Sequence, residues 1–130
     1  MEDYDPDIEP DAAQWLDLDE QERIDLVAAY HLAAKLKLPN LTLHAAMHVV
    51  VENQIAEGLD AVVRALPRLM REGLSRHEAV HAIATVFTEL SFDLLNASAA
   101  ETDSASTTEA RYCANIERLS AKEWLRQYGE

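Results

Sequence analysis

The chain contains few of the residues that cross-link or interrupt helices. Its 130 residues include one cysteine, three glycines and four prolines. The single Cys113 excludes an internal disulfide, which fits a reducing compartment. A low content of glycine and proline beside 48% hydrophobic residues favours one compact all-α domain over a disordered or fibrous chain.

Long apolar runs and positive charges are also scarce. No apolar stretch approaches the roughly 18 residues that cross a bilayer, and the N-terminus lacks the pattern of a signal peptide. We therefore expect a cytoplasmic protein with no membrane partner. Eleven Lys and Arg stand against 24 Asp and Glu, with no basic stripe for phosphates, so we expect no nucleic-acid partner.

The negative charge is concentrated at the N-terminus. Residues 1–22 hold ten acidic residues and no basic ones. This composition, with Pro6 and Pro10, predicts a disordered acidic leader over residues 1–18, in which Trp15 and Leu16 alone contact the domain. The favoured interpretation is a solvated leader, and docking on a protein partner is the alternative.

Apolar periodicity predicts a bundle of about four helices in a domain of residues 19–96. The four helices are expected over residues 20–37, 41–57, 61–72 and 76–96. Ser75 and Glu78 match a capping box before the fourth helix. Gly58 fits the end of the second helix, and Pro67 predicts that the third is kinked or split at Leu66.

The remainder of the chain is predicted to be peripheral. Residues 97–108 are rich in Ser, Thr and Ala and are typical of a flexible linker. Residues 109–130 are predicted to form a short C-terminal helical segment, with Ser120 as its N-cap. This segment either packs on the bundle or contacts a protein partner. The sequence does not indicate an oligomeric state.

Four of the five histidines form two pairs spaced four residues apart. These are His44 with His48 and His77 with His81, each on a predicted helix. Roughly 0.15 such pairs are expected by chance, so two are informative. Residues four apart are neighbours on a helix surface, and a pair can bind one metal ion through both imidazoles.

The two pairs can share one ion only if their helices touch. His44, His48, His77 and His81 would then be ligands, with Glu52 as a further ligand or a hydrogen-bond partner. Imidazole-rich sites favour zinc or iron. His31 lies within the apolar face of the first helix, and a core histidine is the favoured interpretation, with a fifth ligand as the alternative.

His77, Glu78 and His81 also match H-E-x-x-H, the zinc-binding motif of metalloproteases. In those enzymes the glutamate activates a zinc-bound water, so Glu78 is the candidate general base. The capping-box position accounts for Glu78 without catalysis, and the chain lacks a convincing strand along which a peptide would extend. The motif is therefore better interpreted as half of a site between two helices.

The segment 39–95 resembles a family of small uncharacterised bacterial proteins. The resemblance rests on the pattern P-x4-H-x2-M-H-x3-E-x-Q, which begins at Pro39, and on R-H-E-A-x-H, which begins at Arg76. It covers a little under half of the chain. It implies a cytoplasmic bacterial protein and the same four histidines, but no activity.

Two functions remain open from the sequence. The first is a small helical metal-binding protein with a histidine-rich site between helices, either a metal-dependent hydrolase or another metalloenzyme. The second is a non-catalytic protein-interaction module whose histidines are structural. Metal content of the purified protein separates the two.

Overall fold

The computed structural model describes residues 1–34, 40–96 and 105–128, and this part of the chain is helical with no strand. The helices are α1 (Ala12–Asp17), α2 (Glu20–Ala33), α3 (Leu41–Glu57), α4 (Asp60–Arg71), α5 (Arg76–Asn96), α6 (Ala105–Arg118) and α7 (Ala121–Tyr128). The all-α class is confirmed. Among the described residues, no helix combines the length and apolar character that crossing a membrane requires.

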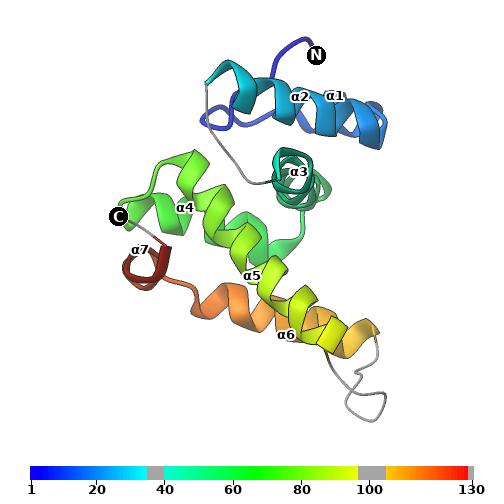
Figure 1. Cartoon of the computed structure of the whole chain (residues 1–130). Helices are drawn as coiled ribbons and strands as arrows, with labels where there is room; N and C mark the ends of the chain where they lie inside the picture. The colour runs from blue at the N-terminus through cyan, green and yellow to red at the C-terminus, as the bar shows by residue number, and fades with distance from the viewer. Residues whose placement is uncertain (35–39, 97–104, 129–130) are drawn as a thin grey trace.

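Helix α3 lies in the middle of the molecule (Figure 1), with α1 and α2 on one side and α4, α5 and α6 on the other. It contacts α1, α2, α4 and α5. Its bounds match the helix predicted over residues 41–57. Burial on opposite sides explains why the β-branched run Val49–Val51 is helical, because tertiary packing outweighs local propensity.

The ends of α3 are fixed by local hydrogen bonds. The Asn40 side chain accepts a bond from Leu43 N at 3.0 Å and caps the first turn. Gly58 ends the helix with φ of 77°, a left-handed conformation that favours glycine, and Leu59 N donates to Gln54 O at 2.9 Å. These caps set where His44 and His48 stand relative to the neighbouring helices.

The predicted leader of residues 1–18 is not a disordered tail. It contains α1, and it buries Tyr4 (4% exposed) and Trp15 (0% exposed) against α2 and α3. The Trp15 indole Nε1–H donates to Asn53 Oδ1 at 2.8 Å. Two aromatic rings supply enough apolar surface to hold an otherwise acidic segment in place, at about 1.5–3 kcal/mol for each large buried side chain.

The C-terminal region is also more helical, and more closely packed on the rest of the fold, than the sequence predicts. Residues 105–108 of the predicted linker belong to α6, and residues 97–104 lie outside the described residues. Helix α6 packs on α4 and α5 and buries Tyr112 and Ile116 in the main core. The fold is therefore larger than four helices with an appendage, since seven helices are present in the described ranges.

Pro67 does not split the third predicted helix, because α4 continues through it from Asp60 to Arg71. A proline removes the bond from its own nitrogen to the carbonyl four residues earlier, here that of Val63. Val63 is 40% exposed. Water can therefore satisfy the freed carbonyl, and the helix tolerates the missing bond.

Candidate metal centre

The two histidine pairs converge because α3 and α5 are in contact. The ring centroids of His44 and His81 are 4.7 Å apart, and those of His48 and His81 are 4.6 Å apart. The Nε2 atoms of His44 and His81 approach to 3.0 Å. The contact on which the shared site depended is therefore present.

His31 joins the pairs from α2 on the other side of α3. Its side chain is fully buried, and its ring centroid lies 4.7 Å from that of His44 and 4.9 Å from that of His48. The interpretation of His31 as an ordinary core histidine needs correction, because its neighbours are imidazoles rather than a hydrocarbon core.

One ligand nitrogen from each of His31, His44, His48 and His81 can be chosen so that all four lie within 4.8 Å of one another. His77 is outside this set of four, although its ring centroid is 4.5 Å from that of His81 and 5.3 Å from that of His48. The structure thus brings together three of the four predicted histidine ligands, adds His31, and leaves His77 at the edge.

The spacing suits a single ion after a small adjustment. Nitrogens bound at about 2.0–2.1 Å in a tetrahedral site are about 3.3–3.4 Å apart. The set contains one pair at 3.0 Å and spans no more than 4.8 Å. Side-chain movements that shift the nitrogens by about an ångström would place all four on one ion. The same set of imidazoles accepts zinc, iron, nickel or copper.

A backbone carbonyl orients His31 for this role. Its Nδ1 lies 2.8 Å from the carbonyl oxygen of Val27, one turn earlier in α2. A carbonyl only accepts, so Nδ1 carries the proton and Nε2 presents a free lone pair. This is the arrangement by which proteins fix the tautomer of a metal-binding histidine.

A tyrosine from the N-terminal segment orients His48. The Tyr4 hydroxyl donates to Glu52 Oε2 at 2.5 Å and lies 3.4 Å from His48 Nδ1. Burial raises the pKa of Tyr4, and the charge of Glu52 raises it further, so the hydroxyl keeps its proton. Since that proton goes to Glu52, the contact with His48 requires a proton on Nδ1, which leaves Nε2 free to coordinate.

Glu52 is therefore a supporting residue, and it lies outside the set of four ligand atoms. Arg76 donates to both of its carboxylate oxygens at 2.8 Å, and the side chains of Glu52 and Arg76 are 1% and 5% exposed. Arg76 also donates to Pro6 O at 2.8 Å. The carboxylate thus joins the leader, α3 and α5 immediately behind His48.

Several imidazole nitrogens of the cluster are buried without a hydrogen-bond partner. Of the five such side-chain atoms in the described ranges, three are the Nε2 atoms of His31, His48 and His77. Leaving a buried polar atom unpaired costs about 1–3 kcal/mol, so native proteins seldom do so without a reason. Two of the three, those of His31 and His48, belong to residues of the set of four, and a bound metal ion would supply the partner that both lack.

Burial favours the neutral form of four imidazoles in the cluster, those of His44, His48, His77 and His81. Burial lowers the pKa of His44 to about 4 and that of His81 to about 3, and neighbouring histidines add to both shifts. The pKa of His48 is also lowered, first by burial and then by the charges of its neighbours. For His77, burial and His31 lower the pKa while Asp7 opposes them. Neutral imidazole is the form that binds metal.

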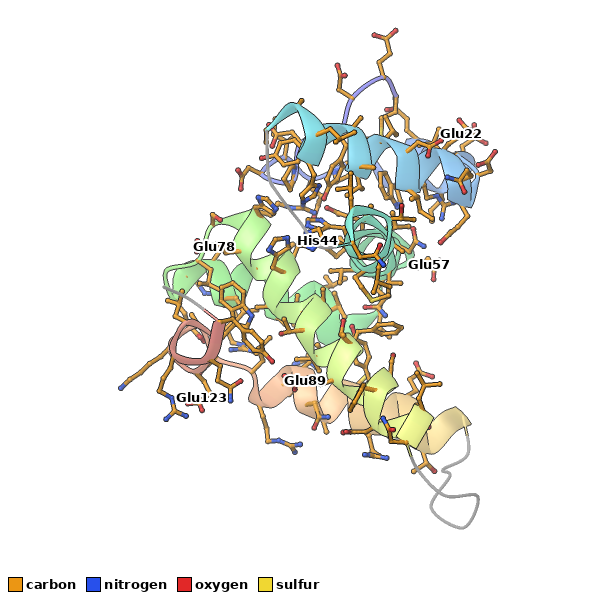
Figure 2. All side chains as sticks on the ribbon, in the orientation of Figure 1. Glu22, His44, Glu57, Glu78, Glu89 and Glu123 are labelled. Carbon is orange, nitrogen blue, oxygen red and sulfur yellow. The ribbon has the colours of Figure 1, made fainter. Side chains whose placement is uncertain are left out.

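Glu78 forms the helix cap that its spacing predicts. Glu78 Oε1 accepts from Ser75 N at 2.9 Å, and Ser75 Oγ accepts from Glu78 N at 3.0 Å. Figure 2 shows Glu78 on the side of α5 away from α3, while His44 lies between the two helices. A role for Glu78 as general base stays a prediction, and its carboxylate is engaged in the cap.

A pocket of about 380 Å³ reaches the cluster from the surface. His44, His48 and His81 form one end, and Trp124 and Tyr128 of α7 form part of the wall. The candidate centre is thus buried on the side of α2 and accessible between α3, α5 and α7.

Comparisons of the chain with protein-family models, with curated proteins and with solved structures found no match.

Two supporting residues, Tyr4 and Arg76, were not identified from the sequence, and His31 was given as a fifth ligand only in the alternative interpretation. Tyr4 lies in a segment whose charge predicts disorder, Arg76 was recognised only as part of a pattern, and His31 lacks a partner four residues away. The available signals were the single aromatic ring in the first fourteen residues and the position of His31 within an apolar helix face. Neither signal indicates which residue it will meet.

Acidification is expected to destabilise the metal-free protein. The pKa values of His44 and His81 are lowered in the folded state, so the unfolded chain binds more protons below about pH 6.5, and stability falls from about pH 7 towards pH 3. Allowing for solvent screening of His44, we expect a loss of about 3 kcal/mol between pH 7.5 and pH 5. Urea unfolding at both pH values, with a chelator present to keep the protein metal-free, measures this loss of unfolding free energy.

The control is His44→Gln/His81→Gln, which removes two of the titrating groups. Its unfolding free energy should depend less steeply on pH over the same range. A metal-free wild type that is equally stable at pH 7.5 and pH 5 would contradict the prediction.

Proposed function

We propose that this protein binds one divalent transition-metal ion through His31, His44, His48 and His81. The observation that carries the proposal is the set of four ligand nitrogens within 4.8 Å of one another, contributed by three helices. Two of these histidines, His31 and His48, have bonded or contacted Nδ1 atoms and unpaired Nε2 atoms. That division of roles is expected of metal ligands.

Zinc is the preferred ion and iron the second. Four neutral imidazoles around one point suit the tetrahedral, nitrogen-rich coordination of zinc. Iron sites in helical bundles usually include carboxylates from the same helices, and here Glu52 is bound by Arg76 and Tyr4 instead. Access through the pocket supports a functional ion over a purely structural one, because it would let a fifth ligand reach the ion, and hydrolysis at a water bound in that position is one reaction of such a site.

The test is the metal content of the purified protein after reconstitution with zinc or, anaerobically, with iron. We expect about one ion per chain, and chelation should lower the unfolding free energy by about 3 kcal/mol if the free ion is a hundredfold above its Kd. Less than about 0.1 ion per chain with both metals would refute the proposal and favour the interaction module with structural histidines.

The bacterial family, the cytoplasmic location and a protein partner for the leader or the C-terminal helix stay predictions. The leader retains an acidic surface, since Glu2, Asp3 and Asp5 are exposed. A basic partner could contact these side chains without displacing Tyr4.

A further inference from the structure

The pocket beside the histidine centre has nitrogen ligands at one end and an apolar wall elsewhere. His44, His48 and His81 contribute the ligand end, while Met47, Ala84 and Trp124 belong to the wall. Its volume of about 380 Å³ lies at the lower end of the range for small-molecule sites. A ligand with one polar group and a single ring system fits these dimensions.

The hydroxyl groups along the wall are already engaged within the protein. Thr85 Oγ1 donates to Ala82 O at 2.6 Å, and Thr88 Oγ1 donates to Ala84 O at 2.9 Å. The Tyr128 hydroxyl donates to Glu89. The body of a ligand therefore meets methyl groups and aromatic rings, and apolar contact rather than hydrogen bonding would hold it.

The ligand end of the pocket favours negative charge. A divalent ion bound by four neutral imidazoles keeps both of its charges, and the four-residue set contains no carboxylate. The charge of Glu52 is matched by Arg76, and Asp5 and Asp7 act on His77 outside the set. In a partly desolvated pocket, an anionic oxygen donor bound to the ion as a fifth ligand would offset this excess charge.

The indole of Trp124 contributes to the apolar wall. Trp124 lines the pocket, is 9% exposed, and its Nε1–H has no hydrogen-bond partner among the described residues. This nitrogen is itself buried, so the pocket meets the ring carbons of Trp124 rather than the donor.

We propose that this pocket binds a small aromatic carboxylate, with the carboxylate on the metal ion and the ring between Met47 and Trp124. The inference rests on the proposed function, because the ion supplies the charge that selects an anion. It adds the chemical class of the ligand and the residues that select it.

Calorimetric titration of the zinc-loaded protein with benzoate, acetate and benzamide tests the inference. Acetate has the carboxylate without the ring, and benzamide has the ring without the charge. We expect benzoate to bind at least about tenfold more tightly than either, because it alone combines ring burial with a charged donor. The zinc content of each sample is measured first.

Two variants that narrow the pocket provide the matched test. Ala84→Leu places a larger side chain from α5 in the pocket and reduces its volume. Thr88→Phe does the same from a more exposed position, in case the first variant does not fold. Both should keep zinc and lose the preference for benzoate over acetate. Ala33→Leu adds the same side chain as Ala84→Leu at an exposed site on α2 and should keep the preference.

The possible failures are distinguishable. Zinc bound at one ion per chain without a preference for benzoate would overturn this inference and leave the metal centre intact. A preference that survives Ala84→Leu or Thr88→Phe in a folded protein would place the ligand elsewhere and also overturn it. Failure to bind either zinc or iron would overturn the proposed function and this inference together.

Discussion

Replacing His31 by glutamine is expected to weaken zinc binding by at least about 100-fold, whereas His77→Gln should weaken it by no more than about tenfold. The two residues are matched, since each has a buried Nε2 atom without a partner and a ring in contact with His48 and His81. They differ in that His31 belongs to the set of four ligand atoms and His77 does not.

Competition with a chromophoric zinc chelator measures both affinities, and circular dichroism checks that each variant is folded. Equal losses would indicate that His77 is also a ligand. A larger loss for His77→Gln than for His31→Gln would restore the set predicted from sequence, in which the two spaced pairs alone hold the ion, and would contradict the geometry described above.

Breaking the Glu52–Arg76 pair is expected to have the largest effect on stability. Glu52→Gln leaves the Arg76 guanidinium, 5% exposed, without its carboxylate. An unpaired buried charge of this kind costs about 3–5 kcal/mol. Arg76→Met should lower the free energy of unfolding by a similar amount, because it leaves the buried Glu52 carboxylate without its guanidinium. The double variant Glu52→Gln/Arg76→Met should lower it by clearly less than the sum of the two single variants.

The matched control is the exposed pair of Arg64 and Glu117, whose side chains are 59% and 55% exposed. Glu117→Gln should cost no more than about 1 kcal/mol, because water screens an exposed ion pair. Chemical denaturation of the metal-free proteins at pH 7.5 gives all of these values. If Glu52→Gln proved as mild as Glu117→Gln, the buried pair would not be the link that holds the leader to α5.

Local features of the sequence were sufficient to predict most of the helices. The Asn40 and Gly58 boundaries of α3 and the reciprocal cap between Ser75 and Glu78 involve residues close in the chain. Such signals depend on a few backbone groups and one side chain, so they can be recognised without knowing the fold. At Pro67 the predicted split is absent, since α4 continues through the proline, and the local sequence does not show whether the freed carbonyl reaches water.

The leader shows why composition alone was misleading. Ten acidic residues in the first 22 favour a solvated chain. Tyr4 and Trp15 nevertheless bury their rings, and Asp7 accepts a 3.0 Å bond from His77 N at the start of α5. A carboxylate is stabilised at a helix N-terminus, but the partner here is 70 residues away, so only the folded chain reveals it.

The candidate centre likewise has features that the local sequence determines and features that only the folded chain determines. The sequence by itself determined that four histidines stand in pairs on single helix faces, because a spacing of four residues is a local property of the helix. Tertiary structure alone decided which faces meet. Helix α5 packs on α3, and α2 contributes His31 to the set of four, from which His77 is absent. Arg76 donates to both carboxylate oxygens of Glu52. Long-range contacts reflect the burial of whole helix faces and the pairing of buried charges, which no short stretch of sequence specifies.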